Sequence, residues 1–326
     1  MFYVKNNQTD PRYNLALEEF LLKDESIQEP ILLLWQNSPT VVIGLYQNTL
    51  EEINSDFVRE NNVNVVRRIT GGGAVYHDLG NLNYSFIAMG VDEEINFKKF
   101  TKPLLEALKY MGINAELTGR NDLLVDGKKF SGNAQYYYQH RLLHHGTILY
   151  DSNLEDVQKA LKVKPGKIES KGIKSVRGRV TNLKPYISED MTVTEFKQYL
   201  LNYFIKTYGI KEYVLSEEDS KAVENLVKTK YLTWDWTYAS SPNCNVTRGA
   251  FFKCGYIEFR FQVEHNVICE TYVNGDFFSL CDMKEFLDKF KGIRYERESI
   301  EQFLNSVELT KYFGEITAEE IVNVIC

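Results

Sequence analysis

The sequence RRITGGGAVYHDLGNLNYS, residues 67–85, is the stretch around which the rest of the chain is organised. Three consecutive glycines, residues 71–73, separate the strand-like runs 63–69 and 74–76. Glycine has no Cβ, so a ligand can lie directly on its backbone, and positive φ is allowed. Three glycines in a row cost much conformational entropy. That cost is explained if exposed N–H groups wrap an anion or an elongated ligand.

Cationic and polar side chains surround these glycines. Guanidinium groups such as those of Arg67 and Arg68 suit carboxylates and phosphates. Four further polar residues lie in the same stretch: Thr70, His77, Asp78 and Asn81. The alternative interpretation is a tight β-turn with two surface arginines, but the clustering favours a binding site. GxxxxGK[ST] is absent and GxGxxG does not fit, so a nucleotide would bind here through another architecture.

The stretch resembles the lipoate-binding loop of lipoate–protein ligases, whose pattern is close to RR-x-[ST]-GGGAV-[YF]-HD. Two further segments are similar to that family: GRNDLLVDGKKFSGNA (119–134) to its catalytic lysine segment and KGIKSVRGRVTNL (171–183) to its adenylate-binding loop. The order and spacing fit the long bacterial form. The resemblance implies the fold shared with biotin ligases, which is class II synthetase-like: an α+β fold with a mixed, mostly antiparallel sheet flanked by helices.

Composition excludes several classes of function. With 326 residues, the chain is long enough for a catalytic domain and a smaller one. A net charge of −7 argues against general binding to nucleic acid, which usually needs a basic face. No apolar run approaches the roughly 20 residues of a membrane span, and MFYVKNNQTDPR has no signal-peptide core, so we expect a cytoplasmic protein. All five cysteines follow residue 243 without a CxxC pair, so neither a metal site nor a disulfide framework is expected.

Local patterns predict two domains, 1–243 with the catalytic site and 244–326 as a small accessory α+β unit. Asp10-Pro11 predicts a helix start, and the following Glu18 and Glu19 fall off the apolar face and should be solvated. ILLLW (31–35) and TVVIG (40–44) predict buried strands joined by a turn. The remaining expectations are a strand face shared by Trp234, Trp236 and Tyr238, a linker at 240–243, a turn at Asn274-Gly275, and helices at 192–208, 217–230, 282–291, 297–306 and 317–325.

A hairpin turn at Asp126-Gly127 places Lys128 and Lys129 at the start of a returning strand. Adjacent strand residues point to opposite faces, so one lysine faces the site and the other faces away. The residues alone do not choose between them. The family pattern puts the catalytic lysine two residues before the Ser-Gly pair, which implies Lys129.

The resemblance also implies a set of binding residues. For lipoate these are Arg68, Thr70, Gly71, Gly72, Gly73, His77, Lys129 and His145. For ATP or AMP they are Arg68, Gly73, Ala74, Val75, Tyr76, Asn81, Asn121, Asp122 and Lys129. The alternatives are a turn-capping role for Asn121 and Asp122 and a packed His145. The basic run 162–179 is either a solvated loop or an electrostatic lid over phosphates, with Lys171, Lys174, Arg177 and Arg179 as candidates.

This residue set suits activation of a carboxylic acid. A carboxylate is a poor electrophile, and ATP converts it into an acyl adenylate that can be passed to a lysine. The site then needs an apolar slot, for which Leu45 and Tyr46 are candidates, cationic and N–H donors, and exclusion of water. Mg²⁺ is expected with ATP. The resemblance implies lipoate or octanoate as the acid, and lipoyl domains of 2-oxoacid dehydrogenases or the glycine cleavage H protein as acceptors.

Three other functions are considered. Octanoyl- or lipoyl-transferases of the same fold use a cysteine nucleophile and no ATP, but no cysteine occurs in residues 1–243. Biotin ligases carry a GRGRxGR-type loop that is missing here. A non-catalytic lipoate-binding module would bind ligand without releasing AMP, and the lysine beside the glycine loop argues against it.

Overall fold

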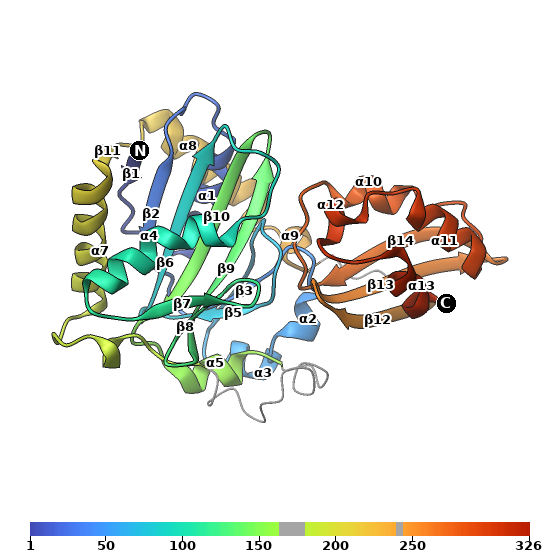
Figure 1. The fold of residues 1–326 in the computed structure, drawn as a ribbon, viewed down its shortest axis with the longest axis horizontal. Helices are drawn as coiled ribbons and strands as arrows, with labels where there is room; N and C mark the ends of the chain where they lie inside the picture. The colour runs from blue at the N-terminus through green and yellow to red at the C-terminus, as the bar shows by residue number, and fades with distance from the viewer. Residues whose placement is uncertain (163–179, 239–243) are drawn as a thin grey trace.

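A computed structural model describes residues 1–162, 180–238 and 244–326 (Figure 1). Its main sheet is built from β1 (Phe2–Val4), β2 (Ile31–Trp35), β6 (Asn81–Met89), β7 (Ala115–Thr118), β8 (Asp122–Val125), β9 (Lys128–Tyr138), β10 (Arg141–Leu149) and β11 (Lys211–Tyr213). The strand order is β11-β1-β2-β6-β10-β9-β8-β7. Strand β1 is parallel to β2 and β11, and the other described pairs are antiparallel, as expected for a mixed, mostly antiparallel sheet.

Helices cover both faces of this sheet. They are α1 (Pro11–Lys23), α4 (Phe97–Tyr110), α7 (Val193–Tyr208), α8 (Glu217–Leu226) and the π-helix η3 (Val227–Tyr231). Strand β2 shows why two cores form. Leu32 and Leu34 join the core with α4 and α7, while Ile31, Leu33 and Trp35 join the core with α1 and α8. Successive strand side chains alternate between faces, so a continuous apolar run is buried on both.

A second, smaller sheet carries the glycine loop. It contains β3 (Thr40–Ile43), β4 (Asn64–Arg67) and β5 (Val75–His77) in the order β4-β3-β5, and residues 68–74 connect β4 to β5. The short helices α2 (Thr49–Glu52), α3 (Ser55–Glu60) and α5 (Leu154–Ala160) lie near it in Figure 1. The strands expected at 31–35 and 40–44 are both confirmed, but they belong to different sheets. A 3₁₀ turn, η2 (Lys184–Tyr186), lies near the start of the described range 180–238.

The C-terminal residues form a separate α+β unit, at the right in Figure 1. Its elements are β12 (Val246–Phe252), β13 (Gly255–Glu264), β14 (Val267–Gly275), α10 (Met283–Asp288), α11 (Arg297–Asn305), α12 (Leu309–Phe313) and α13 (Ala318–Ile325). The three strands form an antiparallel sheet of their own. Fully buried phenylalanines fill the core between sheet and helices, among them Phe259, Phe261, Phe286 and Phe290. The unit therefore has its own hydrophobic core.

Two local expectations in the C-terminal half are wrong. Asn274-Gly275 is not a turn: it ends β14, and the Gly275 N–H donates to the Tyr46 carbonyl at 2.8 Å. The turn is at His265-Asn266, whose φ angles are +48° and +63°. Trp234–Tyr238 is helix α9 rather than a strand. The Thr233 hydroxyl accepts the Trp236 N–H at 3.3 Å, so a side-chain cap starts this short helix. The expected linker at 240–243 lies outside the described residues.

The two glutamates of α1 are buried, so the expectation that they are solvated is wrong. Each is 1% exposed. Glu19 accepts hydrogen bonds from Lys23, Lys230 and Tyr231. Burial alone would raise the pKa of Glu19, but the Lys230 ammonium and these three hydrogen bonds outweigh it and lower the pKa. Glu18 accepts from Ser85 and His145. Buried carboxylates persist only with such partners.

Arg67 holds the glycine loop, the 44–47 turn and α9 together. Its side chain is 2% exposed, so it is not a surface arginine. Its guanidinium donates to the carbonyls of Gly44, Leu45, Gln47, Trp236 and Thr237 and to the Thr49 hydroxyl, at 2.7–3.0 Å. The pKa of Arg67 is lowered to about 10 by burial, so the group remains charged at neutral pH.

Substitution Arg67→Met is expected to lower the free energy of unfolding by on the order of 3–5 kcal/mol, because it leaves several buried carbonyls without donors. Urea denaturation measures this. Arg59→Met is the matched control, since the Arg59 side chain is 72% exposed and pairs with the equally exposed Asp56; its effect should stay within about 0.5 kcal/mol. Equal midpoints for the two variants would contradict the structural role of Arg67.

Candidate active site

A cavity of about 660 Å³ opens between the glycine loop, the β8–β10 strands and the C-terminal unit. Ten of the residues predicted for lipoate or nucleotide line it: Arg68, Gly72, Gly73, Ala74, Val75, His77, Asn121, Asp122, Lys129 and His145. Four do not line it: Thr70, Gly71, Tyr76 and Asn81. Within the loop, the Thr70 hydroxyl contacts His145 and Gly71 lies against the Phe277 carbonyl. Tyr76 packs in the small core with β3, and Asn81 donates to Asn83. The structure therefore brings most of the predicted set into one space.

The backbone of the C-terminal unit approaches the glycine loop so closely that side chains would not fit at part of it. A Cβ on Gly71 would lie 2.2 Å from the Phe277 carbonyl oxygen, and Gly72 has a φ of +90°. The Gly72 N–H donates to the same Phe277 carbonyl at 3.1 Å. Only a residue without Cβ tolerates this approach and this φ. In this structure the Gly72 N–H is thus used to dock the C-terminal unit on the loop.

Arg68 shapes the loop from inside. It is 5% exposed and donates to the Thr70 hydroxyl and to the carbonyls of Gly71 and Gly73, at 2.7–2.9 Å. Burial lowers the pKa of Arg68 to about 10, which leaves it charged at neutral pH. Its positive charge therefore lies at the cavity wall while its hydrogen bonds fix the loop's carbonyls.

His145 connects α1 to this arginine. Its Nδ1 lies 3.0 Å from Glu18 Oε1, and its Nε2 lies 2.9 Å from the Thr70 hydroxyl. With Glu18 ionised, His145 donates from Nδ1 and accepts the Thr70 hydroxyl proton at Nε2. Thr70 and His145 thus support the loop through Arg68. Glu18 was missed by sequence reasoning, although Leu15, Glu18, Glu19 and Leu22 form an i, i+3, i+4, i+7 stripe that indicates one buried helix face.

The two lysines of the β8–β9 hairpin diverge as strand alternation predicts. Asp126 and Gly127 form the turn with φ of +47° and +72°. Lys128 is exposed, whereas Lys129 is 35% exposed, lines the cavity and donates to Asp122 Oδ1 at 2.7 Å. Nearby, the Asn121 amide donates to the Asn133 carbonyl at 2.5 Å, which ties β9 to the start of β8. The hairpin therefore presents one ammonium group to the cavity.

Several cavity residues were not predicted from the sequence, among them Arg120 and Asn83. Among the described residues, Arg120 Nη1, Asn83 Nδ2 and His77 Nε2 are buried polar atoms without a hydrogen-bond partner. Arg120 Nη2 donates to the Asp276 carbonyl at 3.0 Å, and its guanidinium lies 4.7 Å from the Phe278 ring centre. An unpaired buried polar atom costs about 1–3 kcal/mol, so three in one cavity indicate a polar ligand. The GRND sequence is the signal that could have identified Arg120.

The C-terminal unit closes one wall of the cavity. It contributes Phe251, Phe252, Lys253, Gly255 and Asp276. Outside the cavity, Phe277 stacks on Tyr46 with ring centres 4.6 Å apart. Tyr46, a candidate for the acyl slot, therefore contacts the C-terminal unit instead of lining the cavity. Leu45, the other candidate, does not line the cavity either.

Two family models cover most of the chain. Residues 10–205 match the lipoyl protein ligase A/B catalytic domain, and residues 241–325 match the bacterial lipoate protein ligase C-terminus. The lipoate-protein ligase LplJ of Bacillus subtilis is 44% identical over 100% of both chains. The chain belongs to the lipoate–protein ligase family. Lipoate–protein ligase 1 of Staphylococcus aureus is 42% identical over 99% of each chain.

Solved structures of ligases share the fold. LipL1 of P. falciparum, in complex with lipoate, has a TM-score of 0.79 and 27% identity, covering 94% of both chains. A bipartite ligase of Thermoplasma acidophilum with its E2 lipoyl domain has a TM-score of 0.65 and 29% identity, covering 75% of this chain and 98% of that one. A lipoate-protein ligase A bound with ATP has a TM-score of 0.62 and 28% identity, covering 73% and 96%.

These findings confirm the family resemblance, the fold class and the enzyme class, that of a lipoate–protein ligase. The lid candidates Lys171, Lys174, Arg177 and Arg179 lie outside the described residues, as does the proposed domain boundary at residue 243. Within the part of the chain that the structure describes, no helix is long and apolar enough to cross a membrane. No group of three or more His, Cys, Asp or Glu side chains there could hold a metal ion.

Proposed function

We propose that this ligase activates free lipoate or octanoate with ATP and transfers the acyl group to a lysine of a lipoyl domain. The observation that carries the proposal is that one cavity joins Lys129, the glycine loop and the unpaired polar atoms of Arg120, His77 and Asn83. Its volume of about 660 Å³ lies within the roughly 300–1,000 Å³ of small-molecule sites. Similar ligases bind lipoate in one solved structure and ATP in another.

In the first step, a carboxylate oxygen of the acid attacks the α-phosphorus of ATP and pyrophosphate leaves. Negative charge is then concentrated on the carboxylate and the α-phosphate. A lysine ammonium has three N–H donors, and Asp122 accepts one from Lys129, so two remain for an oxygen of each reactant. Lys129 therefore acts as an electrostatic clamp and forms no covalent acyl-enzyme.

In the second step, a neutral lysine of the acceptor attacks the acyl carbonyl, and AMP leaves. The acyl tail needs an apolar wall while the adenylate is protected from water. Leu15, Trp35, Val42 and Ala134 line the cavity and supply this wall. Thr70 and Gly71 act by holding the loop, in place of the direct contact that the resemblance implies.

The described residues do not fit a protein-held Mg²⁺. Asp122 is paired with Lys129, and Asp276 Oδ1 accepts the Tyr256 N–H at 2.5 Å. A magnesium ion that enters with ATP would be coordinated mainly by phosphates and water. No step above depends on it.

We infer that the acceptors are lipoyl domains of 2-oxoacid dehydrogenases or the glycine cleavage H protein. The archaeal ligase described above is reported with an E2 lipoyl domain, which supports the first of these. We also keep the cytoplasmic location in this proposal, because all five cysteines are free thiols, as is usual in a reducing compartment.

Incubation with ATP, lipoate and a lipoyl domain is expected to release AMP and to increase the mass of the domain by one lipoyl group. Mass spectrometry and nucleotide chromatography measure both products. A reaction without lipoate is the control. Domain modification without AMP release would instead favour a transferase, and lipoate binding with neither product would favour a non-catalytic binding module.

A further inference from the structure

The two ring nitrogens of His77, a buried residue of the cavity wall, differ in their hydrogen-bond partners. Its side chain is 3% exposed, and Nδ1 lies 3.1 Å from the side-chain amide of Asn37. Nε2 has no hydrogen-bond partner among the described residues, and His77 lines the cavity. Whether Nε2 is a donor or an acceptor depends on which atom Asn37 turns toward Nδ1.

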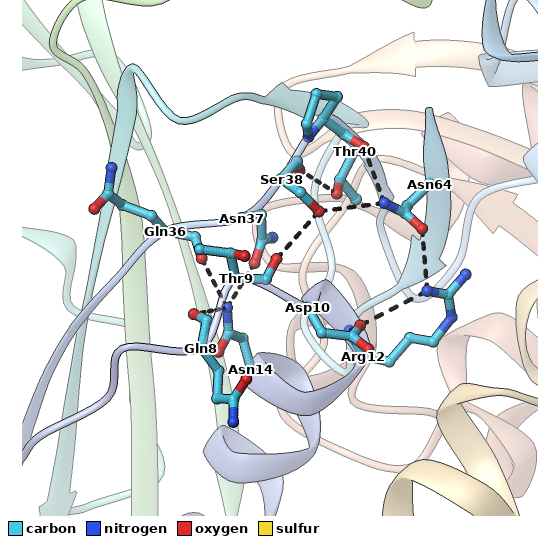
Figure 2. A network of polar contacts seen from close by, with 11 residues as sticks. Gln8, Thr9, Asp10, Arg12, Asn14, Gln36, Asn37, Ser38, Thr40 and Asn64 are labelled. Carbon is cyan, nitrogen blue, oxygen red and sulfur yellow. Dashed lines mark hydrogen bonds and ion pairs between the residues drawn. The ribbon is translucent and has the colours of Figure 1, made fainter. Parts of the chain in front are cut away.

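Asn14 decides the orientation of Asn37. The Asn14 amide nitrogen lies 2.8 Å from the Gln36 carbonyl and 3.2 Å from the Gln8 carbonyl. Figure 2 draws these contacts as dashed lines. Backbone carbonyls only accept, so this atom must be the NH₂ group of Asn14. Its two N–H groups serve the two nearest acceptors, the Gln36 carbonyl and Asn37 Oδ1, each at 2.8 Å. The oxygen of Asn37 therefore faces Asn14, and its NH₂ group faces His77.

Asn6 fixes the same polarity independently. The Gln8 backbone N–H donates to Asn6 Oδ1 at 2.9 Å. A backbone N–H only donates, so the Asn6 oxygen must face it, and the Asn6 NH₂ group donates to Asn14 Oδ1 at 2.7 Å. The contacts of Asn14 with backbone carbonyls and of Asn6 with the Gln8 N–H therefore require hydrogen bonds to be donated in the same direction along these side chains.

The consequence is a buried series of hydrogen bonds that all run in one direction, here called the relay. Asn6 donates to Asn14, Asn14 donates to Asn37, and Asn37 donates to His77 Nδ1. All four side chains are at most 6% exposed. Burial, together with the nearby charge of Arg68, lowers the pKa of His77 to about 3, so the ring is neutral. A neutral ring that accepts at Nδ1 carries its proton on Nε2.

We propose that Asn6, Asn14 and Asn37 are positioning residues that hold His77 in the Nε2–H tautomer, so that it offers a hydrogen-bond donor to an acceptor atom of the acyl substrate. Trp35, which lines the same wall, packs edge-on against His77 with ring centres 6.2 Å apart. The donor thus lies among the apolar residues assigned to the acyl tail. The inference rests on the proposed function for the identity of the ligand, but the tautomer itself does not.

The test combines ¹⁵N NMR of the histidine rings with lipoate binding by calorimetry, on the full-length protein at pH 9. The wild type is expected to show a bare Nδ1 and a protonated Nε2 at His77, assigned by comparison with His77→Gln. Asn37→Asp removes the donor while keeping an acceptor for Asn14, so the proton should move to Nδ1. Lipoate affinity should then fall roughly tenfold, since a donor at Nε2 is lost.

Asn64→Asp is the matched control. Asn64 belongs to the neighbouring polar network in Figure 2, where it contacts Ser38 and Arg12, but has no contact with His77. It should keep the wild-type tautomer and an affinity within about twofold of wild type. Asn14→Leu is a second variant that frees the Asn37 amide to rotate, and it should give a mixture of His77 tautomers.

A protonated Nδ1 in the wild type would overturn the relay, and this measurement needs no variant to fold. A tautomer switch in Asn37→Asp with unchanged affinity would overturn the donor role toward the substrate. If the wild type binds no lipoate at all, the proposed function fails, while the spectrum of the free protein still tests the relay.

Discussion

Replacing Lys129 by alanine is expected to reduce lipoyl-AMP formation by about 10²–10³-fold while leaving the fold intact. The lysine is the cavity-facing ammonium of the β8–β9 hairpin and pairs with Asp122. Removing it takes away the cation at the point where the charges of carboxylate and α-phosphate meet. A partly exposed hairpin lysine contributes little to stability. Lipoate-dependent exchange of pyrophosphate into ATP measures the effect.

The adjacent Lys128→Ala is the matched control, because Lys128 is exposed and does not line the cavity. It should retain close to wild-type exchange. Near-normal exchange in the Lys129 variant, or equal losses in both, would remove Lys129 from the mechanism. A lower melting temperature in the Lys129 variant alone would show that its loss of activity reflects unfolding.

Deleting residues 245–326 is expected to impair adenylation far more than transfer, by about 10²-fold or more if the wall and the loop are both lost. The C-terminal unit contributes cavity residues, accepts the Gly72 N–H at the Phe277 carbonyl, and holds Arg120 through the Asp276 carbonyl. Because the unit has its own core, the rest of the chain should fold without it.

Adenylation and transfer can be assayed separately because they use different substrates. Pyrophosphate exchange reports the first step, and reaction of preformed lipoyl-AMP with a lipoyl domain reports the second. The second assay serves as the control for folding of the truncated protein. A truncated protein that activates lipoate at the full rate would refute the proposed role of the unit.

Individual strands of the main sheet could be predicted because local patterns and burial agree there. The ILLLW run indicates a strand buried on both faces, and the structure divides its side chains between two cores. The Asp126-Gly127 turn was predictable because both residues tolerate positive φ. The assignment of β2 and β3 to different sheets could not be predicted, because strand partners are set by contacts between distant residues.

The errors arose where tertiary contacts outweigh local pattern. Glu19 is buried because Lys230 and Tyr231, more than 200 residues away, supply its partners. Asn274-Gly275 has the composition of a turn, yet the Gly275 N–H pairs with Tyr46 of the other domain. Trp236 and Arg67 exchange hydrogen bonds, Trp236 Nε1 to the Arg67 carbonyl and Arg67 Nε to the Trp236 carbonyl, which favours helix α9 over a strand.

Those parts of the candidate site that lie within a sequence motif could be predicted. The glycine loop and the lysine hairpin have motifs, and both reach the cavity. Asn83 has no motif of its own and is recognisable only by its unpaired buried nitrogen, whereas Arg120 lies in the GRND sequence but was not singled out from it. The Phe277 carbonyl, which explains why Gly71 has no room for a Cβ, is a backbone atom that no sequence pattern marks.

The central claim is that cations and backbone amides meet at one acid–phosphate junction. A crystal structure with a non-hydrolysable lipoyl-sulfamoyl adenosine tests it most directly. The linkage between acyl group and adenosine should lie within hydrogen-bond distance of Lys129 Nζ and beside residues 72–75, with the tail along Trp35 and Val42. An analogue bound elsewhere, with Lys129 still paired only with Asp122, would contradict the proposed mechanism.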